Sequence, residues 1–344
     1  MCNSKIEISV VIATYNGEKY IQKQLESLMK QSYKPDEVII IDDKSKDATY
    51  GIIKKFVVKN NLKNWKLYQN KKNIGYKKNF YKGIKCAKGN YIFLCDQDDE
   101  WEKNKIELML KVMKANPQLQ ALNCAVKIID ANSKEIAYKN QKNIYNCGFL
   151  YSKEPIGNIT YFTFSYLLKH NISPGCTMVI TKQLKNIFIT NYDYSLPHDW
   201  YLNLLASVEC GCAFYNKVLV KYRRHNNNVI GSNIGLIKGI TLRTKTNRIG
   251  SCEAKENAAN TILRYYEIQG KEIAHNNDEL NKVLKWISVY KDFFKSPNLP
   301  KLAQLYHYSE YYEITKLRIR LWNIIVALKL DDFIIKIVSC RYKK

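Results

Sequence analysis

The sequence lacks several features that would place it in a membrane, secreted or zinc-binding class. Among its 344 residues no apolar run approaches the length of about 18 that a transmembrane helix needs. The first apolar run, residues 6–13, is short and contains Glu7 and Ser9, unlike a secretory signal. The ten cysteines form no CxxC pair, and Cys210 and Cys212 have no histidine at finger spacing. Free thiols without an export signal predict a cytoplasmic location.

Acidic residues are scarce relative to basic ones. The chain has 55 Lys and Arg against 31 Asp and Glu, a formal net charge of +24. Such a charge favours anionic partners such as nucleic acid, an acidic membrane face or phosphorylated substrates. A general bias of the composition towards lysine explains it equally well. The apolar fraction of 46% is ample for a core, so a folded chain is expected.

Strand-like and helix-like segments alternate over about the first 130 residues. Apolar, β-branched runs at 8–14, 38–41 and 91–95 read as buried strands. Between the first two, Ile21, Leu25 and Leu28 recur at helical spacing. This alternation predicts an α/β fold with a mostly parallel sheet and helices on both faces.

The rest of the chain is less regular. Residues 131–172 read as loop, 175–181 as a strand, and 198–208 as a helix. After Gly235, glycine and proline thin out and helical periodicity dominates. We therefore expect one domain over residues 1–235 and a helical region over 236–344.

Polar residues follow the predicted strands at their carboxyl ends, where parallel sheets bind ligands. Asn16 follows the first strand, Asp42 and Asp43 end the second, and Asp96 and Asp98 end the strand at 91–95. Carboxylate oxygens are the ligands that Mg²⁺ and Mn²⁺ prefer. The alternative is a solvated acidic turn in which Asp99 caps a helix starting near Glu102.

Four segments in order carry a resemblance to a known family. They are "VVIATYNG" at 10–17, "IDDKS" at 41–45, "NIG" at 73–75 and "GNYIFLCDQDD" at 89–99. Together they resemble family 2 of the nucleotide-sugar glycosyltransferases over about 230 residues, which implies a Rossmann-like GT-A fold.

The resemblance implies roles for the residues at the strand ends. Thr14 and Tyr15 would hold the nucleobase, Tyr15 by stacking, and Asp43 would accept the ring N–H of the base. Asp96 would contact the ribose, and Asp98 would bind the Mn²⁺ or Mg²⁺ that bridges the diphosphate. Without the resemblance, Asp42 and Asp43 read equally well as a helix cap.

A later segment, "PHDW" at 197–200, lies at the predicted start of a helix. Inverting sugar transfer needs a base for the proton of the acceptor hydroxyl, and the resemblance assigns that role to Asp199. The alternative is that Asp199 caps the helix while His198 and Trp200 pack around it.

The segment "YRRHNNNVIG" at 222–231 resembles the rhamnosyltransferase-like branch of the family. His225 is a candidate metal ligand, with a structural role equally well supported. Arg223 and Arg224 are candidates for neutralising the leaving diphosphate. Arg224 departs from the glutamine that is common in that branch.

These observations predict an inverting, metal-dependent glycosyltransferase that moves rhamnose or another hexose from a nucleotide diphosphate donor. The expected acceptor is a surface polysaccharide or a lipid-linked glycan. A nucleotidyltransferase would more often carry a Gly-rich phosphate loop, and "ATYNGEKY" has one Gly. A nucleic-acid-binding protein would account for the charge, but no binding module is recognisable.

The C-terminal stretch places Leu317, Leu321, Ile324, Ile325 and Leu328 on one helix face with basic flanks. Such a helix can lie on the anionic inner face of the cell membrane. The plainer interpretation is that this stripe packs on the catalytic domain or forms an oligomer with a partner subunit.

Overall fold

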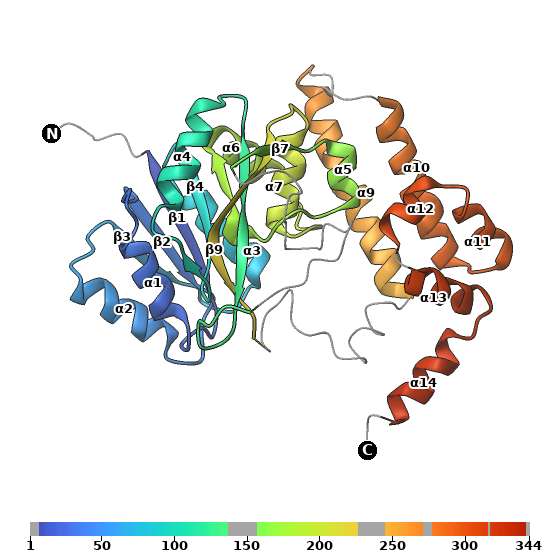
Figure 1. Ribbon diagram of the computed structural model, residues 1–344, viewed down its shortest axis with the longest axis horizontal. Coiled ribbons are helices and arrows are strands. Elements are labelled where there is room, and N and C mark those ends of the chain that lie inside the picture. The colour runs from blue at the N-terminus through green and yellow to red at the C-terminus, as the bar shows by residue number, and fades with distance from the viewer. Residues whose placement is uncertain (1–6, 137–156, 226–244, 271–276, 316, 342–344) are drawn as a thin grey trace. The chain divides into compact units, whose positions relative to one another are not determined.

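The computed structural model describes residues 7–136, 157–225, 245–270, 277–315 and 317–341 (Figure 1). The chain divides into two compact units, Met1–Ile230 and Gly231–Lys344. The domain boundary predicted at residue 235 falls within residues 226–244, outside the described residues.

The first unit is built on one sheet of nine described strands in the order β3-β2-β1-β4-β8-β6-β9-β5, with β7 also paired to β9. Six strands run in one direction, and β5, β7 and β8 run against them. This confirms the predicted mostly parallel sheet. The strands are β1 Ile8–Thr14, β2 Glu37–Asp42, β3 Trp65–Gln69, β4 Tyr91–Asp96, β5 Glu100–Trp101, β6 Ala121–Ile129, β7 Ile159–Tyr161, β8 Val179–Thr181 and β9 Cys212–Arg223.

Helices cover both faces of the sheet (Figure 1). Helices α1 (Ile21–Met29), α2 (Thr49–Lys59) and α4 (Lys105–Ala115) share a core cluster with Val10 and Ile12 of β1. Val11 points to the opposite face because side chains alternate along a strand. There α3 (Tyr76–Cys86) lies so close that a Cβ on Gly83 would come within 2.4 Å of Val11 Cγ1. Helices α6 (Lys182–Asn191) and α7 (His198–Ser207) continue this second layer.

Three local expectations were wrong. Residues 157–172 contain β7 and the helix α5 (Phe164–Lys169), which begins where the Thr163 hydroxyl accepts the Tyr166 N–H. Residues 175–181 form a 3₁₀ turn, Gly175–Thr177, followed by the short β8. The helix expected near Glu102 begins at Lys105, after β5, and Asp99 does not cap it.

The second unit is helical, as predicted. Its described helices are α9 Lys245–Ile268, α10 Asn277–Lys295, α11 Leu299–Leu305, α12 Ser309–Ile314, α13 Leu317–Ala327 and α14 Asp331–Arg341. Trp286 stacks on Tyr290 at 5.0 Å between ring centroids, and Asn323 donates to the Tyr311 hydroxyl at 2.9 Å. Among the described helices, none is both long and apolar enough to cross a bilayer.

Within the second unit, α13 packs mainly through the face opposite its predicted apolar stripe. Leu317, Leu321 and Leu328 are 64%, 53% and 48% exposed. The residues that α13 buries, Trp322 and Val326, lie on the opposite face of the helix. Within this unit the leucines of the stripe are therefore at the surface, while Ile324 and Ile325 are half-buried. Packing of the stripe on the catalytic domain or on a partner subunit stays a prediction.

Candidate functional site

The carboxyl ends of β1, β2 and β4 bring the predicted residues to one edge of the sheet. The parallel register pairs Thr14 with Asp42 and Ala13 with Asp96. Segments that are far apart in the chain therefore converge where the strands end.

Thr14 and Asp43 are buried at this edge and are held by the protein. Thr14 donates its hydroxyl to Asp42 at 3.1 Å. The Asp43 carboxylate accepts the backbone N–H groups of Ile74 and Gly75 at 2.9 and 2.8 Å, and the side chain of Asn70 at 2.8 Å. Asp43 thus shapes the Asn73–Gly75 turn, and a carboxylate has about four acceptor positions, so one stays available for a ligand.

The Tyr15 ring lies at the surface while its backbone is fixed. The side chain is 38% exposed. The backbone N–H donates to Gln97 Oε1 at 2.8 Å, and the backbone carbonyl accepts Gln97 Nε2 at 2.9 Å. An exposed ring on a fixed backbone is available for stacking on a planar ligand.

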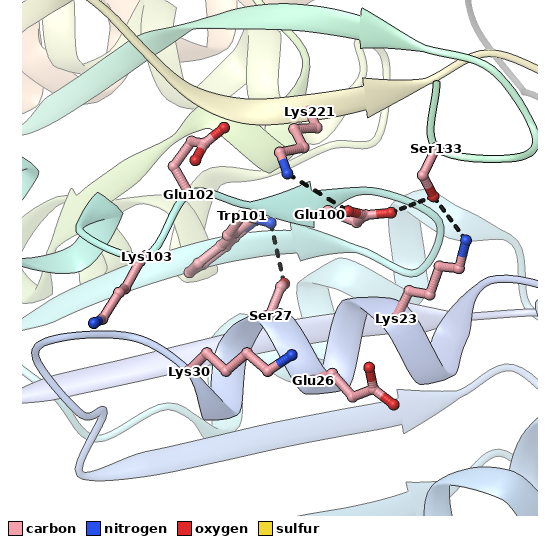
Figure 2. Close-up of a pocket in the computed structure, with 10 residues that line it drawn as sticks. All are labelled: Lys23, Glu26, Ser27, Lys30, Glu100, Trp101, Glu102, Lys103, Ser133 and Lys221. Carbon is pink, nitrogen blue, oxygen red and sulfur yellow. Dashed lines mark hydrogen bonds and ion pairs between the residues drawn. The ribbon is translucent and has the colours of Figure 1, made fainter. Parts of the chain in front are cut away.

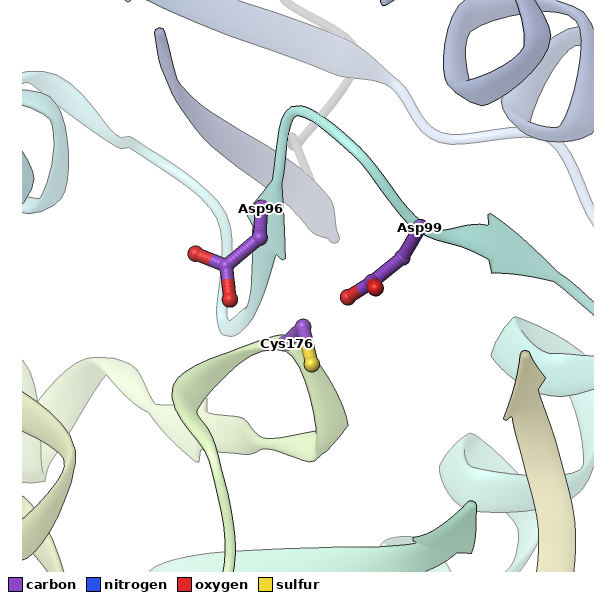
Figure 3. Close-up of side chains that lie close together, drawn as sticks. All are labelled: Asp96, Asp99 and Cys176. Atoms are coloured by element: carbon purple, nitrogen blue, oxygen red, sulfur yellow. The ribbon is translucent and has the colours of Figure 1, made fainter. Parts of the chain in front are cut away.

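Asp96, Asp99 and Cys176 converge below the strand ends (Figure 3). One ligand atom from each lies within 4.8 Å of the others. Burial, then the charges of Asp99 and Asp98, hold the pKa of Asp96 well above its usual range. Burial and the Asp98 charge raise the pKa of Asp99 to about 7. Burial also raises the pKa of the Cys176 thiol, so this sulfur stays protonated near neutral pH.

A buried cation lies beneath this cluster. The ammonium group of Lys105 is fully buried, donates to the Cys176 carbonyl and lies 3.5 Å from the centroid of the Trp101 ring. Burial lowers the pKa of Lys105, and the nearby thiols and Asp99 oppose that fall. Lys105 therefore offsets part of the negative charge at the end of β4.

Asp98 contacts His225, unlike Asp96 and Asp99, which lie next to Cys176. Its Oδ2 lies 2.8 Å from His225 Nε2, and both side chains are largely buried. The His225 ring packs on Tyr20 at 4.8 Å between centroids, with 30° between the ring planes. The structure thus brings together the two residues predicted as metal ligands, although they are 127 positions apart in the chain.

This pair fits a hard divalent cation. The 2.8 Å between Asp98 Oδ2 and His225 Nε2 is a direct hydrogen bond. Two ligand atoms at right angles, each about 2.1 Å from an octahedral ion, lie about 3 Å apart, so a cation could replace this hydrogen bond without a large movement of either side chain. The carboxylate oxygen of Asp98 suits Mn²⁺ or Mg²⁺, whereas the His225 imidazole is a more common ligand of other transition metals and the Cys176 thiol suits softer metals. The donor chemistry therefore favours Asp98 over Cys176 for a hard cation.

Arg223 does not have the surroundings expected of a diphosphate ligand. Its guanidinium is fully buried and donates to the Asp98 carbonyl at 2.7 Å, the Asp130 carbonyl at 2.8 Å and Glu100 at 2.6 Å. Its backbone N–H donates to Asp99 at 2.9 Å. Arg223 therefore fixes the loop that carries Asp98, and its predicted contact with the donor has no support in this geometry.

Asp199 lies in the first turn of α7 and is 3% exposed. Burial raises its pKa to about 6, although hydrogen bonds from the Trp200 backbone and the Asn171 side chain oppose the rise. Its charge also acts on Asp96, so the two carboxyls are near one another. A carboxyl with a pKa near the working pH suits a general base.

His198 precedes Asp199 and is also buried. Its ring stacks on Phe80 at 4.0 Å, and burial lowers its pKa to about 3. Neither ring nitrogen has a hydrogen-bond partner in the described part of the chain. His198 is therefore a neutral imidazole beside the candidate base.

A separate cavity of about 630 Å³ opens between α1 and β5 (Figure 2). Its lining is of mixed charge, and none of the predicted site residues contributes to it. Glu100, Ser133 and Lys23 are linked there by hydrogen bonds of 2.6 and 2.8 Å. Glu100 and Ser133 also bind Arg223, so this cavity is adjacent to the support of the loop rather than to the strand ends. The lining residues are Lys23, Glu26, Ser27, Lys30, Glu100, Trp101, Glu102, Lys103, Ser133 and Lys221.

Several residues around the site were not identified from the sequence. Gln97 lies inside the acidic motif, so the sequence predicts its place near the site. The sequence does not predict its contact with Tyr15. Tyr20 directly precedes α1, Lys105 begins α4 and Cys176 lies in the 3₁₀ turn; no local sequence pattern marks these three residues.

Comparison with solved structures identifies the class. The crystal structure of S. aureus TarS 1–349 in complex with UDP superposes with a TM-score of 0.57 at 18% identity, covering 98% of this chain and 92% of that chain. At this identity the likeness establishes the fold alone. The protein has the GT-A fold of glycosyltransferases.

Sequence comparison identifies the family. Residues 9–188 match the model of glycosyl transferase family 2. The dTDP-rhamnosyl transferase RfbG of Shigella flexneri is 30% identical over 286 residues, covering 73% of this chain and 88% of that protein. An uncharacterized glycosyltransferase of Haemophilus influenzae is 26% identical over 314 residues, covering 89% of this chain and 91% of that protein. The chain belongs to glycosyl transferase family 2, which confirms the predicted family and enzyme class over the nucleotidyltransferase and nucleic-acid-binding alternatives.

Proposed function

We propose that the protein is an inverting, metal-dependent glycosyltransferase. It moves rhamnose or another hexose from a nucleotide diphosphate donor to a surface polysaccharide or a lipid-linked glycan. The observation that carries this proposal is the buried Asp199, with its pKa raised to about 6, beside the carboxylates that end β4. The similarity to a dTDP-rhamnosyl transferase supports rhamnose as the first sugar to test.

The donor lies along the strand ends. Tyr15 stacks on the nucleobase, Thr14 and Asp43 line its pocket, and Asp96 accepts a ribose hydroxyl. Asp98 and His225 hold Mn²⁺ or Mg²⁺. When bound, the cation neutralises negative charge on the departing diphosphate. Arg223 has a positioning role in this scheme, because its guanidinium is occupied by protein oxygens.

Asp199 acts on the acceptor. Its carboxylate takes the proton of the acceptor hydroxyl as that oxygen bonds to the anomeric carbon. The bond from that carbon to the diphosphate oxygen breaks, and its electron pair leaves with the nucleoside diphosphate. Attack from the face opposite the leaving group inverts the anomeric centre.

A lipid-linked acceptor would be located at a membrane, so the enzyme would have to work close to one. Residues 317–344 contain seven basic residues against two acidic ones, and the three leucines of the apolar stripe are exposed. This combination suits the anionic inner face of a cell membrane. A cytoplasmic enzyme held peripherally at that face would meet a lipid-linked glycan.

The test is a screen of nucleotide sugars, including dTDP-rhamnose and UDP-hexoses, for hydrolysis with Mn²⁺ and without an acceptor. We expect one donor to release its nucleoside diphosphate, and a chelator to abolish that release. Hydrolysis that a chelator does not change would contradict the metal dependence. The absence of turnover and of binding with every donor would contradict the proposed chemistry.

A further inference from the structure

Gln97 connects two loops that the proposed donor would contact at opposite ends. One is the Tyr15 loop after β1, and the other is the loop that carries Asp96 and Asp98 after β4. The Gln97 amide accepts from the Tyr15 N–H at 2.8 Å and donates to the Tyr15 carbonyl at 2.9 Å. The oxygen and the nitrogen of the Gln97 amide therefore both bond to the backbone of a single residue, Tyr15.

This contact continues the pairing of the two strands. The β1–β4 ladder ends where Ala13 pairs with Asp96, one residue before Gln97. In a parallel ladder the N–H and C=O of one residue bond to two different residues of the neighbouring strand, whereas the Gln97 amide binds both groups of Tyr15 from a single side chain. The loops are thus joined beyond the point where backbone pairing stops.

The Tyr15 loop is shaped around this amide. A Cβ on Gly17 would lie 2.3 Å from Gln97 Oε1 and 2.5 Å from Gln97 Cδ. Asn16, between Tyr15 and Gly17, has a φ of 49°, in the left-handed region that short polar residues tolerate. Since the amide is anchored by two hydrogen bonds, a side chain at residue 17 would displace it.

Gln97 is placed to act through its neighbours. It follows Asp96, precedes Asp98 and is joined to Tyr15. If one donor molecule touches the Tyr15 ring with its base and the Asp98 side with its diphosphate, ordering either loop orders the other. A ligand that orders a shared element makes binding at the second site more favourable.

We propose that Gln97 is a positioning residue that couples nucleobase binding at Tyr15 to metal-dependent diphosphate binding at Asp98. The inference rests on the proposed function. Without the amide, each end of the donor binds to a loop that is no longer ordered by the other end. The measurable consequence is a smaller gain in nucleotide affinity when Mn²⁺ is added.

The test variant is Gln97→Met, because methionine matches the length of glutamine, loses both hydrogen bonds and adds no charge near the metal ligands. Gln118→Met is the matched control. Gln118 is exposed, lies just before β6 and donates to the Tyr161 hydroxyl. Thermal melts followed by circular dichroism establish that both variants are folded.

The first measurement is hydrogen exchange of the Tyr15 backbone amide in the full chain without nucleotide. We expect faster exchange in Gln97→Met and parent-like exchange in Gln118→Met. Unchanged exchange in Gln97→Met would overturn the contact itself. This result does not depend on the enzyme's reaction.

The second measurement is calorimetry with dTDP and UDP, each with and without Mn²⁺. We expect the factor by which Mn²⁺ tightens nucleotide binding to fall about five-fold or more in Gln97→Met, and to stay at the parent value in Gln118→Met. Faster exchange with an unchanged factor would overturn the coupling. If the parent binds neither nucleotide, the proposed function fails and with it the coupling, while the exchange result still decides the Tyr15 contact.

Discussion

Three aspartates within four residues repel one another, and in the structure each contacts a different group. Asp96 lies beside Cys176, Asp98 contacts His225, and Asp99 accepts the Arg223 N–H. Lys105 adds a buried positive charge below them. Burial, and after it the charges of neighbouring carboxylates, raises the pKa of Asp96 and Asp99.

The positions of these aspartates were predictable from the sequence, and their partners were not. A strand-like run followed by Asp96 and Asp98 places both carboxylates at a ligand-binding edge. The contact between Asp98 and His225 spans 127 positions, and that between Arg223 and Asp99 spans 124. Only the order of strands in the sheet brings such residues together, and no local pattern specifies that order.

Asp98 offers the most direct test of the metal site. We expect Asp98→Ala to abolish the Mn²⁺-dependent part of nucleoside diphosphate binding, because one of the two proposed ligands is lost. Calorimetry with and without Mn²⁺ measures this effect. Asp332→Ala, at an exposed position of α14, is the control and should match the parent. Unchanged metal-dependent affinity in Asp98→Ala would remove this residue from the site.

Asp199 does not cap α7, because Pro197 occupies the N-cap and no side chain caps the helix. Asp199→Asn therefore separates a base from a residue that only stabilises the first turn, since asparagine keeps the shape of aspartate but its amide cannot accept the hydroxyl proton. We expect the transfer rate at saturating donor to fall about 10²–10⁴-fold, with donor affinity nearly unchanged. A rate within a few-fold of the parent would contradict the assignment.

The pH dependence provides a second signature of Asp199. A base works in its ionised form, and burial raises the pKa of Asp199 to about 6. The parent rate should therefore rise with pH through about 6 and then level off. The residual rate of Asp199→Asn should lack this acidic limb. Rates at saturating donor from pH 5 to 8 would show whether the limb belongs to this residue.

At the scale of elements, long periodic segments were predicted well and short ones were not. The strand at 8–14 and the helix starting at 198 matched because their apolar patterns extend over whole elements. The strands β5 and β8 have two and three residues, too few for a period to appear. Both owe their position to pairing with distant strands, and β5 directly follows Asp99, where the alternative interpretation of the acidic turn placed a helix cap.

Two helix glycines test how tightly the layers pack. Ala is favoured over Gly within helices by about 1 kcal/mol. A Cβ on Gly51 of α2 would meet no atom within 4 Å, whereas one on Gly83 of α3 would lie 2.4 Å from Val11 Cγ1. We expect Gly51→Ala to raise the free energy of unfolding by about 0.5–1 kcal/mol. Gly83→Ala should lower it by about 1–3 kcal/mol, because overpacking forces α3 away from β1. Denaturant titrations of both variants would contradict this account if the two changes had the same sign.

At the scale of the whole molecule, the charge of +24 is not explained by the strand-end site, which is rich in carboxylates. An excess of lysine on exposed surface raises the local concentration of anionic partners. The sequence indicated such a partner without locating its contact. Within the second unit, the structure adds that the leucines of this stripe are exposed while the opposite face of α13 packs, a distinction that the helical pattern alone did not make.

The exposed stripe leads to a prediction about membranes. A basic amphipathic helix binds an anionic surface through its charge and by burying its apolar face. Leu321 on α13 and Leu299 on α11 are 53% and 54% exposed, so Leu→Ser at either position removes a similar amount of apolar surface. If α13 inserts, Leu321→Ser loses about 1.5–3 kcal/mol of burial, roughly a ten-fold or larger fall in partitioning. Leu299→Ser should then partition like the parent.

Flotation with vesicles containing anionic lipid at low salt measures this partitioning. Neutral vesicles should bind less protein, because the basic flanks have no anionic lipid to contact there. A parent that stays in the dense fraction, or two variants that fall equally, would refute a role for α13 at the membrane.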